Sequence, residues 1–212
     1  GKITNVNETD PMLEFHEGLA AARKNEKIGF LNNKMEWAIE PQFDGKRDFK
    51  NGYAAVKKDE KWGVIDKQGK WVVLYFYPLD FTFVCPTEIK RFNALTEKFA
   101  EKNTVLIACS TDSVFSHLAW QERSDLERLK HIHASDNNHV VSEAYGVLDD
   151  EKGIAWRGTF FISPDGLLKA AHVNHGEGGR NVDEVLRTLE VFQNEVEGKM
   201  VPCGWKPGED FL

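Results

Sequence analysis

An apolar strand that leads directly into a turn and a helix constrains the fold of this chain more than any other feature. Residues 71–77 are all apolar or aromatic, Pro78 ends the run, and apolar side chains recur at helical spacing along residues 87–102. Cys85 lies between the turn and the helix. A thiol in the first turn of a helix faces unpaired backbone N–H groups and the positive end of the helix dipole, which favour the thiolate. The segment therefore predicts a buried strand followed by a reactive cysteine.

Predicted strands and helices alternate from Trp71 onward. Strands are predicted over residues 71–77, 104–108, 159–162 and 168–173, and helices over residues 87–102 and 116–130. Asn181 is predicted to cap a last helix, with Glu184 completing a capping box. This alternation predicts an α/β fold in which helices cover a mixed sheet.

The first third of the chain contains an internal repeat. Residues 15–30 align with residues 49–64, and 34 residues separate Gly18 from Gly52 and Gly29 from Gly63. Both copies read as short strands broken by polar turns. The pair Trp62-Gly63 resembles the WG-repeat family, whereas the first copy departs from that pattern with Ile28-Gly29. We therefore expect a small β-rich repeat module over residues 1–68, ahead of a second domain over residues 69–212.

Two repeats are few for an independent module, because each repeat normally buries its apolar face against a neighbour. We expect the module to pack on the second domain or on another subunit.

Composition excludes several classes of partner. The net charge of −7 gives no reason to expect nucleic acid or an anionic membrane, and no apolar run reaches the length of a membrane span. Residues 1–6 lack the apolar core of a signal peptide. The chain has three cysteines, a low and odd number that argues against a secreted disulfide framework, so we expect a cytoplasmic protein.

The spacing Pro78-x3-Thr82-x2-Cys85 resembles the active-site motif of the peroxiredoxins. Cys203, in the run Val-Pro-Cys-Gly-Trp, resembles the resolving cysteine of the typical 2-Cys subgroup, which includes the alkyl hydroperoxide reductase C proteins. Other matching segments are residues 81–88, 117–120, 145–148, 157–160 and 179–180. The resemblance covers residues 69–212 and implies a thioredoxin-like mixed sheet covered by helices. It also leads us to interpret residues 49–69 as a replacement for the family's N-terminal hairpin.

The resemblance implies a role for each residue of the motif. Cys85 is expected to attack a peroxide and become a sulfenic acid; a buried structural cysteine is the alternative for a lone thiol. The Thr82 hydroxyl is expected to hydrogen-bond the thiolate and the attacking oxygen, although a bare threonine would be interpreted as a cap or core residue. Pro78 is expected to shield the thiolate from water.

Charged residues outside the motif are expected to support the thiol. The resemblance makes Arg157 the guanidinium that stabilises the thiolate and polarises the peroxide, against the alternative of a surface ion pair. Glu88 is expected to orient Arg157 through a carboxylate–guanidinium pair, and Arg180 is a candidate second cation.

Cys203 is expected to attack the Cys85 sulfenic acid and form a disulfide, which in the family joins two subunits. A homodimer follows, and the sequence leaves open whether dimers assemble into a decamer. An incidental cysteine is the alternative for Cys203, and Cys109 is interpreted as a core residue.

No metal or bound cofactor is expected. His131, His133 and His139, or His172 and His175, could suggest a metal site, but neither set has helical ligand spacing or accompanying cysteines. Residues 176–179 are glycine-rich without the pattern of a phosphate-binding loop.

The leading interpretation is a thiol peroxidase that reduces hydrogen peroxide and alkyl hydroperoxides. A thioredoxin-like or flavoprotein disulfide reductase would regenerate it. Two alternatives from other classes remain: a binding protein whose domain senses peroxide for a partner of the repeat module, and a holdase.

Overall fold

The computed structural model describes residues 14–50, 52–58, 60–67, 69–123 and 126–212. The chain divides into two compact units. The N-terminal unit comprises residues 1–72 together with residues 162–168, and the C-terminal unit comprises residues 73–161 and 169–212. The first 13 residues of the predicted module, and residues 124–125 of a predicted helix, lie outside the described residues.

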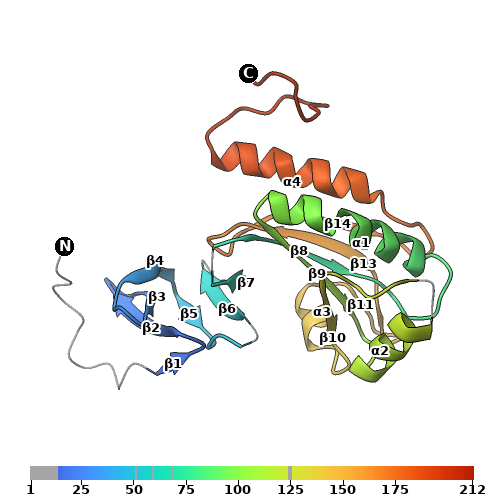
Figure 1. The fold of residues 1–212 in the computed structure, drawn as a ribbon, viewed down its shortest axis with the longest axis horizontal. Coiled ribbons are helices and arrows are strands. Elements are labelled where there is room, and N and C mark those ends of the chain that lie inside the picture. The colour runs from blue at the N-terminus through green and yellow to red at the C-terminus, as the bar shows by residue number, and fades with distance from the viewer. Residues whose placement is uncertain (1–13, 51, 59, 68, 124–125) are drawn as a thin grey trace. The chain divides into compact units, whose positions relative to one another are not determined.

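The N-terminal unit contains two antiparallel sheets, of orders β1-β2-β3-β4 and β5-β6-β7 (Figure 1). The strands of the first sheet are β1 (Phe15–His16), β2 (Leu19–Lys24), β3 (Lys27–Asn32) and β4 (Trp37–Phe43). Those of the second are β5 (Gly45–Lys46), β6 (Tyr53–Lys58) and β7 (Lys61–Asp66).

Both copies of the 34-residue repeat fold as the same hairpin. Leu19 pairs with Asn32 in the first hairpin, and Tyr53 pairs with Asp66 at the equivalent positions of the second. Asn25 and Glu26, which connect the first pair of strands, have φ angles of 50° and 65°. Left-handed conformations at both turn positions match the right-handed twist of a tight hairpin.

The third strand differs between the two copies. β4 begins at Trp37 and pairs with β3, whereas β8 (Trp71–Phe76), which begins 34 residues later, lies in the five-stranded sheet described below. The hairpin β6–β7 shares its sheet with β5 and not with β8. Its interpretation as the family's N-terminal hairpin therefore stays a prediction.

One glycine in each hairpin lies against the backbone of the segment beside it, and the two segments differ. A Cβ atom on Gly29 would lie 2.6 Å from the carbonyl oxygen of Ile39 in β4, and one on Gly63 would lie 2.4 Å from the carbonyl oxygen of Gly166. Both distances are too short for a side chain, so each glycine permits a close backbone approach. The turn at residues 162–168 thus occupies, beside β7, the place that β4 occupies beside β3, and Lys58 pairs with Asp165 of this turn at 3.1 Å.

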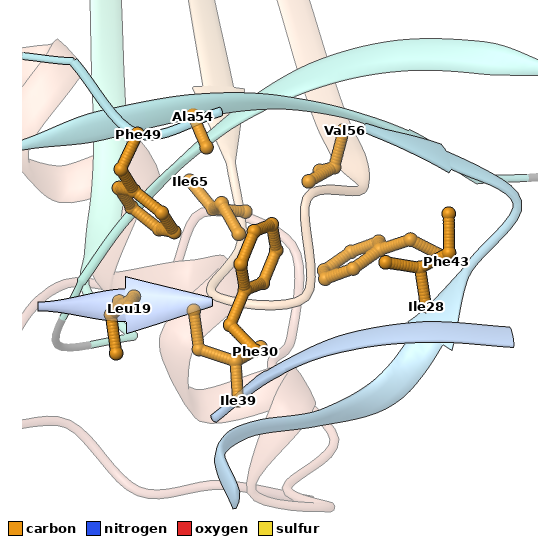
Figure 2. Close-up of a cluster of buried hydrophobic side chains, with 9 residues drawn as sticks. All are labelled: Leu19, Ile28, Phe30, Ile39, Phe43, Phe49, Ala54, Val56 and Ile65. Carbon is orange, nitrogen blue, oxygen red and sulfur yellow. The ribbon is translucent and has the colours of Figure 1, made fainter. Parts of the chain in front are cut away.

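Both sheets of the N-terminal unit contribute to one hydrophobic cluster (Figure 2). Its buried members are Leu19, Ile28, Phe30, Ile39, Phe43, Phe49, Ala54, Val56 and Ile65. The rings of Phe30 and Phe49 meet edge to face, with centroids 4.9 Å apart. The first repeat therefore buries its apolar face against the second, as expected for stacked repeats.

The C-terminal unit is built on a mixed five-stranded sheet of order β10-β9-β8-β13-β14, in which β9 and β10 are parallel. The remaining strands are β9 (Thr104–Ser110), β10 (Ile132–Ser135), β11 (Leu148–Asp149), β12 (Ile154–Ala155), β13 (Arg157–Ile162) and β14 (Leu168–Asn174). The helices are α1 (Cys85–Glu101), α2 (Val114–Arg123), α3 (Val140–Ala144) and α4 (Val182–Val196). Helices α1 and α4 lie side by side over one face of the sheet, and α2 and α3 lie on the opposite side (Figure 1). Among the described residues, no helix is both long and apolar enough to cross a membrane.

Burial explains this layering. Every residue of β8 and of β13 is buried, because these central strands have a helical layer on each side. Helix α1 turns its buried residues Ile89, Phe92, Leu95 and Phe99 toward the sheet, as their spacing predicted. The mixed α/β fold with its strand–turn–helix unit is confirmed.

Two helix ends differ from prediction. Residues 127–130 are not helical, because side chains take their backbone N–H groups: Gln121 Oε1 accepts from Leu129 and Asn93 Oδ1 accepts from Lys130. Asn181 caps α4 as predicted, accepting hydrogen bonds from the backbone N–H groups of residues 183 and 184. The Glu184 carboxylate, however, accepts from Arg187 instead of completing the capping box.

Candidate active site

Cys85 is the first residue of α1, and its side chain is buried. Val84 is the N-cap and offers no capping side chain, so the N–H groups of the first turn are not taken by a side-chain cap. Pro86 supports the start of the helix, because its fixed φ angle suits the first helical turn. The sequence thus places a thiol where backbone dipoles favour negative charge.

Arg157, the first residue of β13, approaches the thiol from the sheet. Its Nη1 donates to Cys85 Sγ at 3.3 Å and to Glu88 Oε2 at 2.6 Å. Its Nε donates to the carbonyl oxygen of Gly176 at 3.2 Å. Because the guanidinium is buried and held at two other points, it presents a fixed positive charge to the sulfur.

Arg180 holds the other side of the same carboxylate. Its Nε and its backbone N–H each donate to Glu88 Oε1 at 2.8 Å. Nη1 donates to the carbonyl oxygen of Gly158 at 2.9 Å and to Thr159 Oγ1 at 3.0 Å, and Nη2 donates to the carbonyl oxygen of Phe76. Arg180 therefore ties α1 to both central strands, β8 and β13.

The side chains of Arg157, Arg180 and Glu88 together carry an excess positive charge that a thiolate would neutralise. Two buried guanidinium groups, of Arg157 and Arg180, share one buried carboxylate, that of Glu88. These three side chains carry a net charge of one positive unit, and an ionised Cys85 would balance it. Such an arrangement can stabilise both a thiolate and the negative charge that develops on an oxygen bound beside it.

The turn before α1 holds the other two residues of the motif. Pro78 is half-buried and lines a pocket of about 60 Å³ together with Trp156 and Gly176. The Thr82 hydroxyl donates to the carbonyl oxygen of Leu79 at 3.0 Å. Its predicted hydrogen bond to Cys85 stays a prediction.

The three cysteines differ in their surroundings, and all are free thiols. Cys203 is exposed, whereas Cys109 is buried in β9, where desolvation and the nearby Asp136 raise its pKa to about 12. A thiol with so high a pKa is inert at neutral pH. This environment fits the interpretation of Cys109 as a core residue.

Sequence reasoning missed the anchor that presents Cys203. Trp205 is buried, its Nε1 donates to the carbonyl oxygen of Glu209 at 3.0 Å, and its own carbonyl oxygen accepts from Arg187 Nη1 at 2.7 Å. The segment after α4 is therefore fixed two residues beyond the exposed thiol. An isolated tryptophan in a polar tail was the available signal.

Sequence reasoning also missed a polar cluster of Asp80, His117 and His133. Their ligand atoms lie within 4.8 Å of one another, which is close enough for one metal ion. In this structure the same atoms are hydrogen bonded to one another or to Tyr77. We therefore do not assign them as metal ligands. No sequence spacing reveals this group, because its members come from a turn, a helix and a strand.

Comparison with known proteins identifies the family of this chain. The model of the AhpC/TSA family matches residues 41–171. Peroxiredoxin prdx-2 of Caenorhabditis elegans is 49% identical over 146 residues, which are 66% of this chain and 73% of that protein. A thioredoxin peroxidase of Fasciola hepatica is 47% identical over 141 residues, which are 64% of this chain and 73% of that protein.

Solved structures give the same answer for the fold. The reduced 2-Cys peroxiredoxin of Plasmodium vivax superposes with a TM-score of 0.65 at 36% identity, over 72% of this chain and 83% of that one. AhpC of Enterococcus faecalis superposes with a TM-score of 0.62 at 30% identity, over 74% of this chain and 97% of that one. The chain therefore belongs to the AhpC/TSA family and is a peroxiredoxin, a thiol peroxidase that reduces peroxides.

Proposed function

We propose that Cys85 is the peroxidatic residue of this peroxidase and that Arg157, Glu88 and Arg180 keep it ionised. The observation that carries the proposal is the 3.3 Å contact between Arg157 Nη1 and Cys85 Sγ, within a buried group whose charge an ionised sulfur completes. A fixed guanidinium costs no reorganisation when charge moves from sulfur to oxygen.

The chemical step transfers one oxygen atom to sulfur. The Cys85 thiolate attacks the terminal oxygen of a hydroperoxide, the O–O bond breaks, and the alkoxide or hydroxide leaves and takes a proton from water. The sulfur becomes a sulfenic acid, oxidised by two electrons, and the peroxide is reduced to an alcohol or water. Arg157 stabilises the leaving oxygen, Thr82 donates to the bound peroxide after rotation, and Pro78 limits water access.

Cys203 then resolves the sulfenic acid. Its thiol loses a proton, the resulting thiolate attacks the Cys85 sulfur, and a disulfide forms as the S–O bond breaks; the hydroxide leaves and takes up that proton to become water. We propose that the two thiols belong to different subunits of a homodimer, with a decamer as the larger assembly. The exposure of Cys203 on a segment fixed by Trp205 supports this role. A thioredoxin-like or flavoprotein disulfide reductase returns both thiols to the reduced state, and the thioredoxin peroxidases among the relatives favour thioredoxin.

We further propose that residues 1–68 form a WG-repeat-like module attached to a thioredoxin-like domain over residues 69–212. Two hairpins of identical register and the matched close contacts of Gly29 and Gly63 support the module. A cytoplasmic location fits three cysteines that are all free thiols. Peroxide and a disulfide reductase are the partners that we assign, and neither nucleic acid nor membrane is among them.

Peroxide consumption by the purified full-length protein tests the assignment. With thioredoxin and its reductase, we expect turnover that Cys85→Ser abolishes and that Cys203→Ser limits to one equivalent. Cys109→Ser is the matched control and should retain turnover within about twofold, because this buried thiol is inert. Turnover that survives in Cys85→Ser would contradict the assignment.

A further inference from the structure

The turn between β8 and α1 is held at its centre by Asp80, a buried residue that the proposed mechanism does not use. Its backbone N–H donates to Asp112 Oδ2 at 3.0 Å. Its carboxylate accepts from the Tyr77 hydroxyl at 2.7 Å, from the Ser116 hydroxyl at 2.8 Å and from His117 Nδ1 at 2.9 Å. Asp80 lies between Pro78 and Thr82, so these bonds fix the segment that carries both residues.

His117 links Asp80 to β10. Nε2 faces the carbonyl oxygen of Ala134 at 3.2 Å, and Nδ1 faces the carboxylate of Asp80 at 2.9 Å. Burial alone would raise the pKa of Asp80, but hydrogen bonds from His117, Tyr77 and Ser116, with the charge on His117, hold it below its ordinary value.

The neighbours of His133 determine which of its ring nitrogens carries the proton. Its Nδ1 lies 3.2 Å from the amide nitrogen of Gln121, whose Oε1 already accepts from the backbone N–H of Leu129 at 3.1 Å. The Gln121 amide is thereby oriented, and His133 Nδ1 must accept. Nε2 then carries the single proton and donates it to the Tyr77 oxygen. Partial burial is the main cause that lowers the pKa of His133 to about 3, which keeps the ring neutral.

These bonds form one directed chain. Gln121 donates to His133, His133 donates to Tyr77, and Tyr77 has only its own proton left to give, which goes to Asp80. We propose that His133 is a positioning residue for the reaction of Cys85: by donating to Tyr77 it fixes the Tyr77–Asp80 bond and so holds Pro78 and Thr82 in place. The inference rests on the proposed function, because it concerns the geometry offered to the peroxide.

The residue directly before strand β10 provides a matched control. His131 lies two residues before His133, just ahead of β10, and is also half-buried. Its Nε2 lies 2.7 Å from the Tyr75 hydroxyl, and its Nδ1 lies 3.3 Å from the Thr96 hydroxyl. These hydrogen bonds lead to β8 and to α1, and not to the Asp80 turn. Losing His131 costs comparable hydrogen bonds without loosening that turn.

The experiment compares two reactions of reduced, full-length protein: the single-turnover rate with hydrogen peroxide and the rate of Cys85 alkylation by iodoacetamide. Alkylation needs only an accessible thiolate, whereas peroxide also needs Pro78 and Thr82 in position. We expect His133→Met to lower the peroxide rate about tenfold, since small displacements of positioned groups cost about this much or more. The alkylation rate should change by less than about twofold, because Arg157 reaches the sulfur from β13.

A conservative variant and the control complete the design. His133→Gln keeps an N–H donor at the position of Nε2 and should recover the peroxide rate to within about threefold of wild type. His131→Met should keep it within about twofold although the protein becomes less stable. If His133→Met does not fold, His133→Asn, whose shorter side chain cannot reach Tyr77, takes its place in the comparison with His133→Gln.

Three results would overturn the inference: equal peroxide rates in wild type and the His133 variants, an equal loss in His131→Met, or a stoichiometric bound metal whose chelation slows the peroxide reaction. The last would make the cluster a metal site. A wild-type protein without Cys85-dependent peroxide consumption would instead overturn the proposed function.

Discussion

Glu88 is the residue on which the charge balance of the site depends. Without its carboxylate, two buried guanidinium groups would lack the negative charge that they share. Without Arg157, the thiol would lose the side-chain hydrogen bond that Nη1 donates to its sulfur. A buried charge that loses its partner is strongly destabilising. We therefore expect that replacing Arg157 lowers the peroxide rate more, and that replacing Glu88 lowers the free energy of unfolding more.

Replacing Arg157 tests the cation directly. We expect Arg157→Met to lower the peroxide rate by about 100-fold or more, as for the loss of one preorganised donor. Arg157→Lys keeps the positive charge but not the forked geometry, so its peroxide rate should lie between those of wild type and Arg157→Met. Arg91 lies on α1, is exposed and pairs with Asp183, so Arg91→Met is the control and should stay within about twofold of the wild-type rate. Equal rates for Arg157→Met and Arg91→Met would contradict the assignment.

Sequence reasoning predicted the contact of Arg157 with Cys85 and the pairing of Glu88 because both follow a recognisable motif. It could not place Asp80, His117 and His133 together, because each lies on a different element and only the folded sheet brings them into contact. It also could not foresee that Thr82 donates to the Leu79 carbonyl, since a hydroxyl rotates to whichever acceptor is nearest.

Two half-buried histidines lie at the start of strand β10. His131 directly precedes the strand, His133 is its second residue, and both are neutral in the folded protein. Partial burial lowers the pKa of His131 to about 4, and burial together with the charge on His117 lowers that of His133 to about 3. Apolar periodicity did not indicate β10, because the two histidines are buried through hydrogen bonds to Tyr75 and Tyr77 and not by apolar packing.

These histidines predict acid sensitivity. The unfolded chain takes up protons below the ordinary histidine pKa of about 6.5, whereas the folded chain does not until far lower pH. Stability is therefore complete above that value and falls as the pH drops toward 4. Urea unfolding at pH 7, 6, 5 and 4.5 should show a loss on the order of 2 kcal/mol from each ring, discounted for its partial exposure.

The variant His131→Met separates this effect from others. Its free energy of unfolding should be lower than that of wild type at pH 7 and should decline less between pH 7 and 4.5. Asp80 does not interfere in this window, because its lowered pKa confines its contribution to pH values below its ordinary 3.8. Parallel pH curves for the two proteins would show that His131 does not titrate as described.

Across the chain, the 34-residue sequence period runs into the central sheet at strand β8. The period of 34 residues predicts a third strand for the second repeat at Trp71, and that strand is β8 of the central sheet. The turn after β13 fills the vacated place beside β7. The sequence predicts the repeat and the sheet, but it does not predict that the turn after β13 lies beside β7 where a third strand of the repeat would be. A backbone contact between Gly63 and Gly166 leaves no local pattern in the sequence.

Gly63 is the position that tests the exchange. A Cβ atom there would lie 2.4 Å from the Gly166 carbonyl oxygen, so Gly63→Ala should destabilise the N-terminal unit by about 1–3 kcal/mol. Hydrogen exchange should rise in β6 and β7, while the alkylation rate of Cys85 stays unchanged. Gly178→Ala, where the nearest atom is at 3.8 Å, is the control. Equal protection of β6 and β7 in both variants would show that the turn does not lie against β7.

We propose that Cys85 and Cys203 form one thiol cycle across a dimer. Non-reducing gel electrophoresis of full-length protein after one equivalent of hydrogen peroxide tests this proposal. We expect a dimer band in the wild type and in Cys109→Ser, and monomer alone in Cys85→Ser and in Cys203→Ser. A dimer band that persists in Cys85→Ser would show that the disulfide does not involve Cys85.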